Sequence, residues 1–186
     1  MSEPVRLLVL GDSLTAGYGL PLNDAFPAQL ETALRKRGIE VTVVNAGVSG
    51  DTTAGGRARL DWVLASRPTA VIIELGANDG LRGIAPSATA DNLDAIMGQL
   101  KRQRIPVLLA GMYAPANLGR DYGEAFKTLY PRLAKAHKSL LYPFFLDGVA
   151  GVAELNQDDG IHPNAKGVAV IVERILPAVL KLLGKA

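Results

Sequence analysis

Residues Val5–Gly17 read VRLLVLGDSLTAG, and this stretch indicates the architecture of the whole chain. Its first six residues are mostly branched and apolar, which is typical of a strand that is buried on both faces of a sheet. The polar turn Gly11-Asp12-Ser13 follows at once, and Ser13 stands where a helix would begin. In open α/β sheets, ligands bind in such loops at the carboxyl ends of the strands.

The same alternation of an apolar run and a longer amphipathic stretch recurs along the chain. Alternating strands and helices predict a parallel sheet with helices on both faces. We therefore predict one domain over residues 1–186, a three-layer α/β/α fold with a five-stranded, parallel, flavodoxin-like sheet. The expected strands are Val5–Leu10, Val41–Val44, Ala70–Leu75, Pro106–Ala110 and Leu140–Phe144. The expected helices span about 24–37, 55–66, 89–104, 121–138 and 164–183, with a kink or break at Pro177.

The composition argues against several classes of protein. A chain of 186 residues with 48% hydrophobic residues can bury a core without disulfide bonds, and none can form because cysteine is absent. The formal net charge of +2 and the lack of a long basic stripe argue against a nucleic-acid partner. No apolar run is long enough to span a membrane, so we expect no stable membrane insertion. The oligomeric state is left open, because the sequence has no interface pattern.

Two short basic runs, Arg35–Arg37 and Lys101–Arg104, each close an expected helix. Cations complement the negative carboxyl end of a helix dipole. We therefore interpret both runs in this way rather than as sites that bind an anion.

Five loops rich in glycine, asparagine, aspartate or proline follow the expected strands or precede the last helix. Each loop alone is ordinary turn chemistry. We expect them to meet on one rim of the predicted sheet and to form the functional site there. The loops are Gly11–Gly17, Asn45–Asp51, Gly76–Gly80, Gly111–Asn117 and Asp158–Asn164.

The chain has two histidines in different surroundings. His137 lies among charged residues near the end of an expected helix, which predicts a surface position. His162 lies in a loop on the predicted rim, three residues after Asp159. A turn between them can bring the carboxylate to one ring nitrogen and leave the other nitrogen as a base. The alternative is that Asp159 and His162 only shape a turn and cap the last helix.

Ser13 is the candidate nucleophile on this rim. A base has to polarise a serine hydroxyl before it attacks a carbonyl, and His162 is the base expected nearby. Ser13 has an alternative role, because a serine at the start of a helix often caps it. Ser49, in a glycine-flanked loop, is a competing nucleophile. The G-x-S-x-G elbow is absent, which disfavours an ordinary α/β-hydrolase.

Acyl transfer also needs hydrogen-bond donors aimed at the developing oxyanion. The candidates are the backbone N–H of Ser13, the backbone N–H of Gly47 and the side-chain amide of Asn78. Gly47 lacks Cβ and so allows close approach. Gly47 has an alternative role as a residue that requires positive φ, and Asn78 has one in an Asx turn.

These residues form four blocks that resemble those of the SGNH (GDSL) hydrolases, in the order of that family. One block alone is weak evidence, whereas four in order, the first three each after an expected strand, are highly specific. Other stretches resemble the bacterial acyl-CoA thioesterase I, lysophospholipase and arylesterase branch of the family. The blocks are Gly11-Asp12-Ser13-Leu14, Gly47, Gly76-Ala77-Asn78-Asp79 and Asp159-Gly160-Ile161-His162. The other stretches are Gly11–Leu20, Ala46–Thr52, Gly76–Gly83 and Pro115–Phe126.

The resemblance implies an SGNH-hydrolase-like domain that cleaves small carboxylic esters or acyl thioesters. It implies Ser13 as nucleophile, with Asp159 and His162 completing a catalytic triad. It also implies Ser13, Gly47 and Asn78 as oxyanion donors, and no cofactor or metal.

Enzymes of this branch often act in the periplasm after loss of a signal peptide. No such peptide pattern precedes the first expected strand. A periplasmic location is therefore expected from the resemblance only, with the cytoplasm as the alternative.

The loops that would select the substrate are less informative. Gly80–Ile84 has glycines on both sides of Leu81-Arg82, which is typical of a mobile flap. Leu81, Met112, Tyr113 and Pro115 are candidates for the wall of an acyl pocket. Their alternative role is ordinary loop packing.

Two other functions compete with this interpretation. A carbohydrate acetyl esterase would use the same chemistry, but an aromatic content of 5% argues against a surface that stacks on sugars. A non-hydrolytic, flavodoxin-like binding module would gather Asp12, Asp79 and Asp159 around Mg²⁺ or a phosphoryl group. That module would not explain His162 and Asn78.

Overall fold

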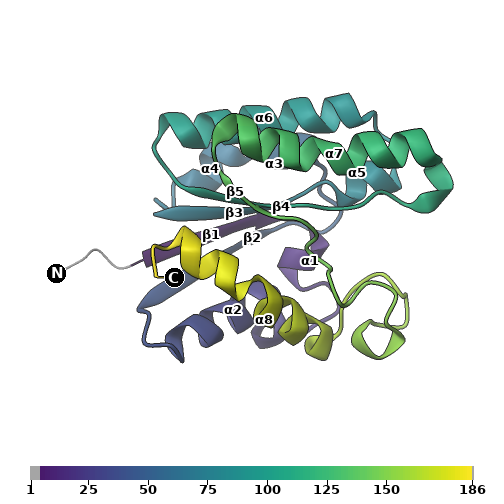
Figure 1. Ribbon diagram of the computed structural model, residues 1–186. Helices are drawn as coiled ribbons and strands as arrows, with labels where there is room; N and C mark the ends of the chain where they lie inside the picture. Colours follow the sequence, from purple (N-terminus) through teal and green to yellow (C-terminus); the bar gives the residue numbers. More distant parts are fainter. Residues whose placement is uncertain (1–4, 186) are drawn as a thin grey trace.

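The computed structural model describes residues 5–185 and contains a five-stranded parallel sheet (Figure 1). The strand order, β2-β1-β3-β4-β5, and the parallel pairing of every neighbouring pair confirm the predicted flavodoxin-like sheet. The strands are β1 (Val5–Gly11), β2 (Val41–Gly47), β3 (Ala70–Glu74), β4 (Val107–Ala110) and β5 (Leu140–Tyr142).

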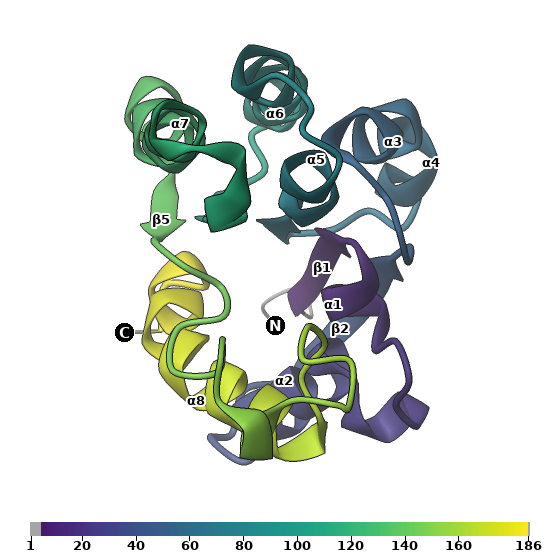
Figure 2. The same cartoon turned by 90° about the vertical axis from the view of Figure 1, so that its right-hand side faces the viewer.

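Helices cover both faces of the sheet, as Figures 1 and 2 show. Helices α2 and α8 pack together on one face, and α3 to α7 cover the other. The helices are α1 (Ser13–Ala16), α2 (Phe26–Arg35), α3 (Thr53–Ala58), α4 (Leu60–Leu64), α5 (Ala77–Leu81), α6 (Pro86–Arg102), α7 (Arg120–His137) and α8 (Ala165–Leu182). Short 3-10 turns, η1 (Leu22–Asp24), η2 (Ala116–Leu118) and η3 (Ala153–Leu155), lie in the loops.

The apolar runs of the sequence become the centre of the sheet. All five residues of β3 are buried, and Leu7–Leu10 of β1 have no exposed surface. Strands with helices on both faces need apolar side chains on both sides, which explains why these runs are continuous rather than alternating.

The helix predicted over 55–66 is two helices, which corrects that prediction. Arg59 stands between α3 and α4 with φ −101° and ψ 6°. Its guanidinium bonds to Asp51 Oδ2 at 2.7 Å and to the carbonyl of Gly11 at 2.9 Å. These contacts hold Arg59 against the loops after β1 and β2.

Of the kink or break predicted at Pro177, the break is wrong, because α8 runs through this residue. Proline removes one backbone hydrogen bond, but Ile175 and Val179 on either side are fully buried. Packing of the apolar face therefore keeps the helix continuous. The strand predicted to reach Phe144 ends at Tyr142, because Pro143 has no N–H to offer a neighbouring strand.

The carboxyl ends of all five strands lie at one edge of the sheet, toward the viewer in Figure 2. The loops that the sequence placed on one rim begin at this edge. Among residues 5–185, no helix is long and apolar enough to cross a membrane. Residues Met1–Pro4, which bear on the question of a signal peptide, lie outside the described part of the chain.

Candidate active site

Ser13 is the first residue of α1, directly after β1 and Asp12. The Asp12 carboxylate caps α1 by accepting the backbone N–H of Leu14 at 3.0 Å, so the alternative that Ser13 caps this helix is wrong. The Ser13 hydroxyl lies 2.9 Å from His162 Nε2 instead. The cap supplied by Asp12 thus leaves the hydroxyl available to the imidazole.

His162 and Asp159 form the pair that the sequence predicted. His162 Nδ1 lies 2.6 Å from Asp159 Oδ2, and the other carboxylate oxygen accepts the backbone N–H groups of Ile161 and His162, each at 2.9 Å. The turn is therefore shaped by the carboxylate, and the imidazole is oriented by it at the same time. Ser13, His162 and Asp159 stand in one continuous hydrogen-bonded chain.

The backbone N–H of His162 is the main reason that the pKa of Asp159 falls from 3.8 to about 2. The side-chain bond to His162 and the N–H of Ile161 lower this pKa further. Asp159 is thus an anion over the whole neutral and acid range in which an imidazole titrates. An anion at this place fixes the proton of the ring on Nδ1 and leaves Nε2 as the acceptor that faces Ser13.

Tyr18 and Gln157 support the imidazole, and the sequence analysis did not identify them. The Tyr18 ring lies against the His162 ring, with centroids 4.6 Å apart and planes tilted by 37°. Gln157 Nε2 donates to the carbonyls of Tyr18 and Pro163, which ties the turn after α1 to the loop that carries His162. The segment that carries Ser13 and the loop that carries His162 are therefore held together by more than the Ser13–His162 contact.

The predicted oxyanion donors lie close to Ser13, but two of them are engaged. Gly47 N–H donates to Asn45 Oδ1 at 2.9 Å. Asn78 Nδ2 donates to Asp12 Oδ2 at 3.1 Å and to the carbonyl of Asp51 at 2.9 Å. The backbone N–H of Ser13, as the first residue of α1, has no acceptor within its helix.

Gly47 is required by close packing rather than by backbone conformation. It is not among the glycines with positive φ, so that alternative is wrong. A Cβ at this position would lie 2.2 Å from the backbone nitrogen of Ala16. The end of β2 therefore touches α1 directly, which keeps the Gly47 amide beside the first turn that carries Ser13.

Two buried carboxyl groups, Asp12 and Glu74, lie beneath this turn. Both have no exposed surface. Glu74 Oε2 accepts the Thr15 hydroxyl at 2.7 Å and the Asp12 N–H at 3.4 Å, whereas Oε1 has no partner within residues 5–185. Burial raises the pKa of Asp12 to about 6, and burial with the charge of Asp12 raises the pKa of Glu74 well above its ordinary value. At least one proton therefore stays on this pair when ordinary carboxyls have lost theirs.

The proton on this pair makes stability depend on pH. Because both pKa values are raised, the folded protein holds protons that the unfolded chain releases, and the free energy of unfolding from this pair falls as the pH rises from 3.8 through about 6. We expect Glu74→Gln to remove the contribution of Glu74, since a glutamine can keep the bonds to Thr15 and Asp12. The stability of the variant relative to wild type should then grow as the pH rises above 4.5, the ordinary pKa of a glutamate, in urea titrations.

The exposed Glu173→Gln on α8 is the matched control, and it should keep a constant offset from wild type. A constant offset for Glu74→Gln as well would mean that Glu74 carries no extra proton in the folded protein.

The predicted pocket residues divide into two groups. Leu81 and Tyr113 are about half exposed at this edge of the sheet, and Pro115 is partly buried beside Gly80 of α5. Tyr113 stacks on Phe144 with centroids 4.2 Å apart. Met112 is only 4% exposed and packs in the core, so it lies away from the surface that a substrate would meet.

The carboxylates of the alternative magnesium site do not form one cluster. Asp79 accepts hydrogen bonds from Thr53 and Thr89, whereas Asp12 faces Asn78 and Asp159 faces His162. Within residues 5–185, no three histidine or acidic side chains are grouped as metal ligands. The geometry therefore gives no support to the binding-module interpretation.

Comparison with known proteins identifies the family of the chain. The GDSL-like Lipase/Acylhydrolase family matches residues 9–170, a range that holds every residue of the predicted triad and oxyanion donors. The chain belongs to this family. Membership confirms the resemblance noted in the sequence.

Two curated relatives in the GDSL family are bacterial. The chain is 44% identical to "Esterase TesA" of Pseudomonas aeruginosa over 178 residues, which is 95% of this chain and 89% of the relative. It is 45% identical to "Thioesterase 1/protease 1/lysophospholipase L1" of Escherichia coli K12 over 159 residues, which is 85% of this chain and 75% of the relative.

A solved esterase structure is also similar to this chain. The structure of the psychrotrophic esterase EstA from Pseudoalteromonas sp., inhibited by monoethylphosphonate, superposes with a TM-score of 0.91 at 33% identity and covers 96% of this chain and 98% of its own. With the curated relatives, it confirms the prediction that this chain is an ester hydrolase.

Proposed function

We propose that the protein hydrolyses carboxylic esters and acyl thioesters through an acyl-enzyme on Ser13. The observation that carries the proposal is the chain from Ser13 Oγ to His162 Nε2 at 2.9 Å and from His162 Nδ1 to Asp159 at 2.6 Å. A base that faces a serine and is itself oriented by a carboxylate is the arrangement needed for nucleophilic acyl transfer.

In the proposed mechanism, His162 takes the Ser13 proton as Oγ attacks the acyl carbon. Asp159 holds the ring and stabilises the imidazolium. The imidazolium then protonates the leaving alcohol or thiol, and the acyl group stays on Ser13. A water molecule, deprotonated by His162, attacks the acyl-enzyme and releases the acid. This chemistry needs no cofactor or metal.

The oxyanion of both tetrahedral intermediates would be held by three N–H groups, those of Ser13, Gly47 and the Asn78 side chain. Since Gly47 donates to the exposed Asn45 side chain, the proposal requires substrate to replace Asn45 Oδ1 as its acceptor. Asn78 would share a proton between the oxyanion and its present acceptors, Asp12 and Asp51.

We expect Asn78→Ala to lower kcat on the order of 10²–10³, the loss expected for one oxyanion donor. The measurement is kcat on p-nitrophenyl butyrate, together with the melting temperature, because Asn78 also bridges two loops. Asn45→Ala is the matched control, since it removes the competing acceptor of Gly47 and should leave kcat at or above that of wild type. Loss of activity in Asn45→Ala with retention in Asn78→Ala would contradict the assignment.

The experiment that tests the function is hydrolysis of p-nitrophenyl esters from acetate to palmitate and of acyl-CoA thioesters of the same lengths. The half-exposed Leu81 and Tyr113 favour acyl groups that offer apolar surface, so we expect activity to rise beyond acetate. Turnover of acetylated xylan without turnover of the longer esters would point to a carbohydrate acetyl esterase instead.

The remaining predictions concern the domain organisation, the partners and the cellular location of the protein. The one buried core found within residues 5–185 supports the proposal of one domain over residues 1–186. The proposed partners are small ester and thioester substrates rather than nucleic acid. A periplasmic location stays a prediction with the cytoplasm as alternative, and fractionation of cells that express the native gene distinguishes the two.

A further inference from the structure

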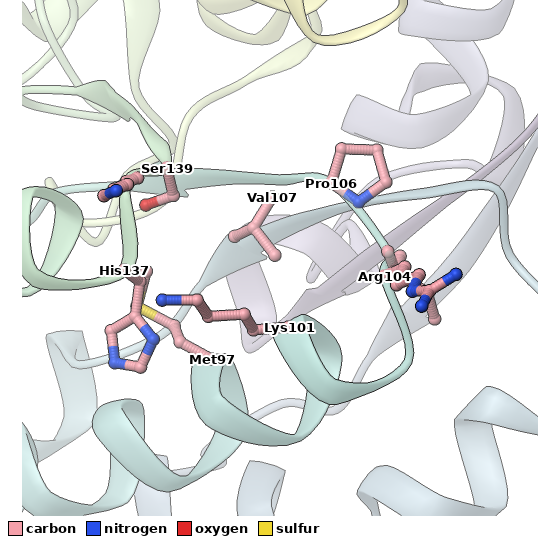
Figure 3. A pocket seen from close by; sticks show the side chains of 9 residues that line it. Met97, Lys101, Arg104, Pro106, Val107, His137 and Ser139 are labelled. Atoms are coloured by element: carbon pink, nitrogen blue, oxygen red, sulfur yellow. The ribbon is translucent and has the colours of Figure 1, made fainter.

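A second concave region lies at the opposite edge of the sheet from Ser13. It is a cavity of about 210 Å³ where α6 and α7 end and where β4 and β5 begin (Figure 3). The proposed hydrolysis does not use any residue that lines it. Its lining combines three kinds of side chain, namely unpartnered polar groups, cations and apolar groups.

The unpartnered polar atoms are His137 Nδ1 and Ser139 Oγ. Both atoms are buried, and neither has a hydrogen-bond partner within residues 5–185. The prediction that His137 is a surface residue is wrong, because its side chain is only 13% exposed and its Nε2 lies 2.7 Å from Asp94 Oδ1. The Ser139 hydroxyl therefore offers a donor beside the cavity, and His137 Nδ1 is a second buried polar atom without a partner there.

The cations are Lys101, Arg104 and Lys138. Figure 3 shows the Lys101 side chain reaching toward the space beside His137 and Ser139, whereas Arg104 lies at the far end. Asp94 is the carboxylate next to this group, and it is already paired with His137. The cavity thus presents positive charge together with the Ser139 hydroxyl as a donor, which suits an anion.

Two of these cations have an unusual backbone conformation. Arg104 has φ 58° and Lys138 has φ 55°, in the left-handed region where a helix end normally carries glycine or asparagine. A third such residue among residues 5–185, Arg67, follows α4 and does not line the cavity. Positive charge after α6 and α7 is explained because cations complement the helix dipole, but this does not explain the two buried polar atoms without partners.

The rest of the lining is apolar and includes Met97, Ile105 and Val107. An inorganic anion would leave this surface without a partner. We propose that the cavity binds a small carboxylate with a short apolar tail. Its carboxylate would face Lys101, Lys138 and Ser139, and its tail would cover the apolar side.

The test is a titration of the intact protein with acetate, butyrate, hexanoate and inorganic phosphate at constant ionic strength, followed by the backbone amide NMR shifts of Val107 and Ser139. Amide shifts separate this cavity from the rim around Ser13, so the result does not depend on the proposed hydrolysis. We expect hexanoate to bind several-fold more tightly than acetate, because its tail buries more apolar surface.

Two variants test the cations. Lys101→Gln should weaken hexanoate binding roughly tenfold, as expected for the loss of one charged hydrogen bond. Lys138→Gly should weaken it similarly but melt no lower than wild type, because glycine adopts positive φ without strain. Arg67→Gly is the matched control, with the same change of backbone preference and no expected change of binding.

Each other outcome would overturn the proposal. Phosphate bound as tightly as hexanoate would make the site one for small anions in general. If acetate, butyrate and hexanoate bound with the same affinity, the tail would make no contact with the apolar side of the cavity. Shifts confined to residues near Ser13, or unchanged binding in Lys101→Gln, would exclude the cavity as the site.

Discussion

Ser13→Ala is expected to lower kcat on p-nitrophenyl esters on the order of 10⁶, the loss expected for a triad nucleophile. The hydroxyl is the group that His162 Nε2 contacts at 2.9 Å, and alanine leaves the imidazole with nothing to activate. Helix α1 should persist, because its cap comes from Asp12. Steady-state kinetics and a melting curve of both proteins provide the measurement.

Ser49→Ala is the control for this variant. Ser49 is exposed and lies in the loop after β2, and sequence reasoning retained it as a competing nucleophile. We expect its kcat to stay near that of wild type. An inactive Ser49→Ala beside an active Ser13→Ala would refute the proposed acyl-enzyme on Ser13.

Asp159→Asn is expected to lower kcat about 10⁴-fold, by analogy with the triad aspartate of serine proteases. One oxygen of the asparagine can still accept the N–H groups of Ile161 and His162, so the turn should persist. Its amide would then present N–H to His162 Nδ1, which favours the ring tautomer with the proton on Nε2. That tautomer cannot accept the Ser13 proton. Stopped assays at saturating substrate measure the effect.

The neighbouring Asp158→Asn is the control, since Asp158 is exposed and should leave kcat unchanged. The pH profile of wild type adds a second check. Because the pKa of Asp159 is about 2, this carboxylate stays charged across the acid range, so a loss of kcat/KM at mildly acid pH should not come from Asp159. A mildly acid limb that disappears in Asp159→Asn would contradict this account.

The sheet and the placement of Ser13, Asp159 and His162 were predictable from local sequence patterns together with the rules of parallel sheets. Continuous apolar runs indicate strands buried on both faces, and parallel strands bring their following loops to one edge. Ser13 and His162 are therefore neighbours although 149 positions separate them. Asp159 and His162 lie three residues apart, so a turn between them was foreseeable.

Other features depend on contacts that no local pattern encodes. The occupied state of the Gly47 and Asn78 donors depends on where Asn45, Asp12 and Asp51 point. The helix predicted over 55–66 breaks because Arg59 reaches a distant carbonyl.

Glu74 did leave a sequence signal, since it is the one charged residue in the apolar run Ala70–Leu75. That Asp12 lies beside Glu74 became clear only from the pairing of β1 with β3.

The link between Gln157 and Tyr18 joins the beginning of the chain to its end. Ser13 leaves the ribosome early, whereas Asp159 and His162 emerge near the close of synthesis. A chain that ends before Asp159 contains all five strands and still lacks the proposed base. On the proposed mechanism such a chain is catalytically silent, and hydrolysis begins only when the C-terminal segment docks beside Tyr18. The onset of enzymatic activity would then mark the docking of the C-terminal segment against the N-terminal part of the chain, rather than the formation of the sheet.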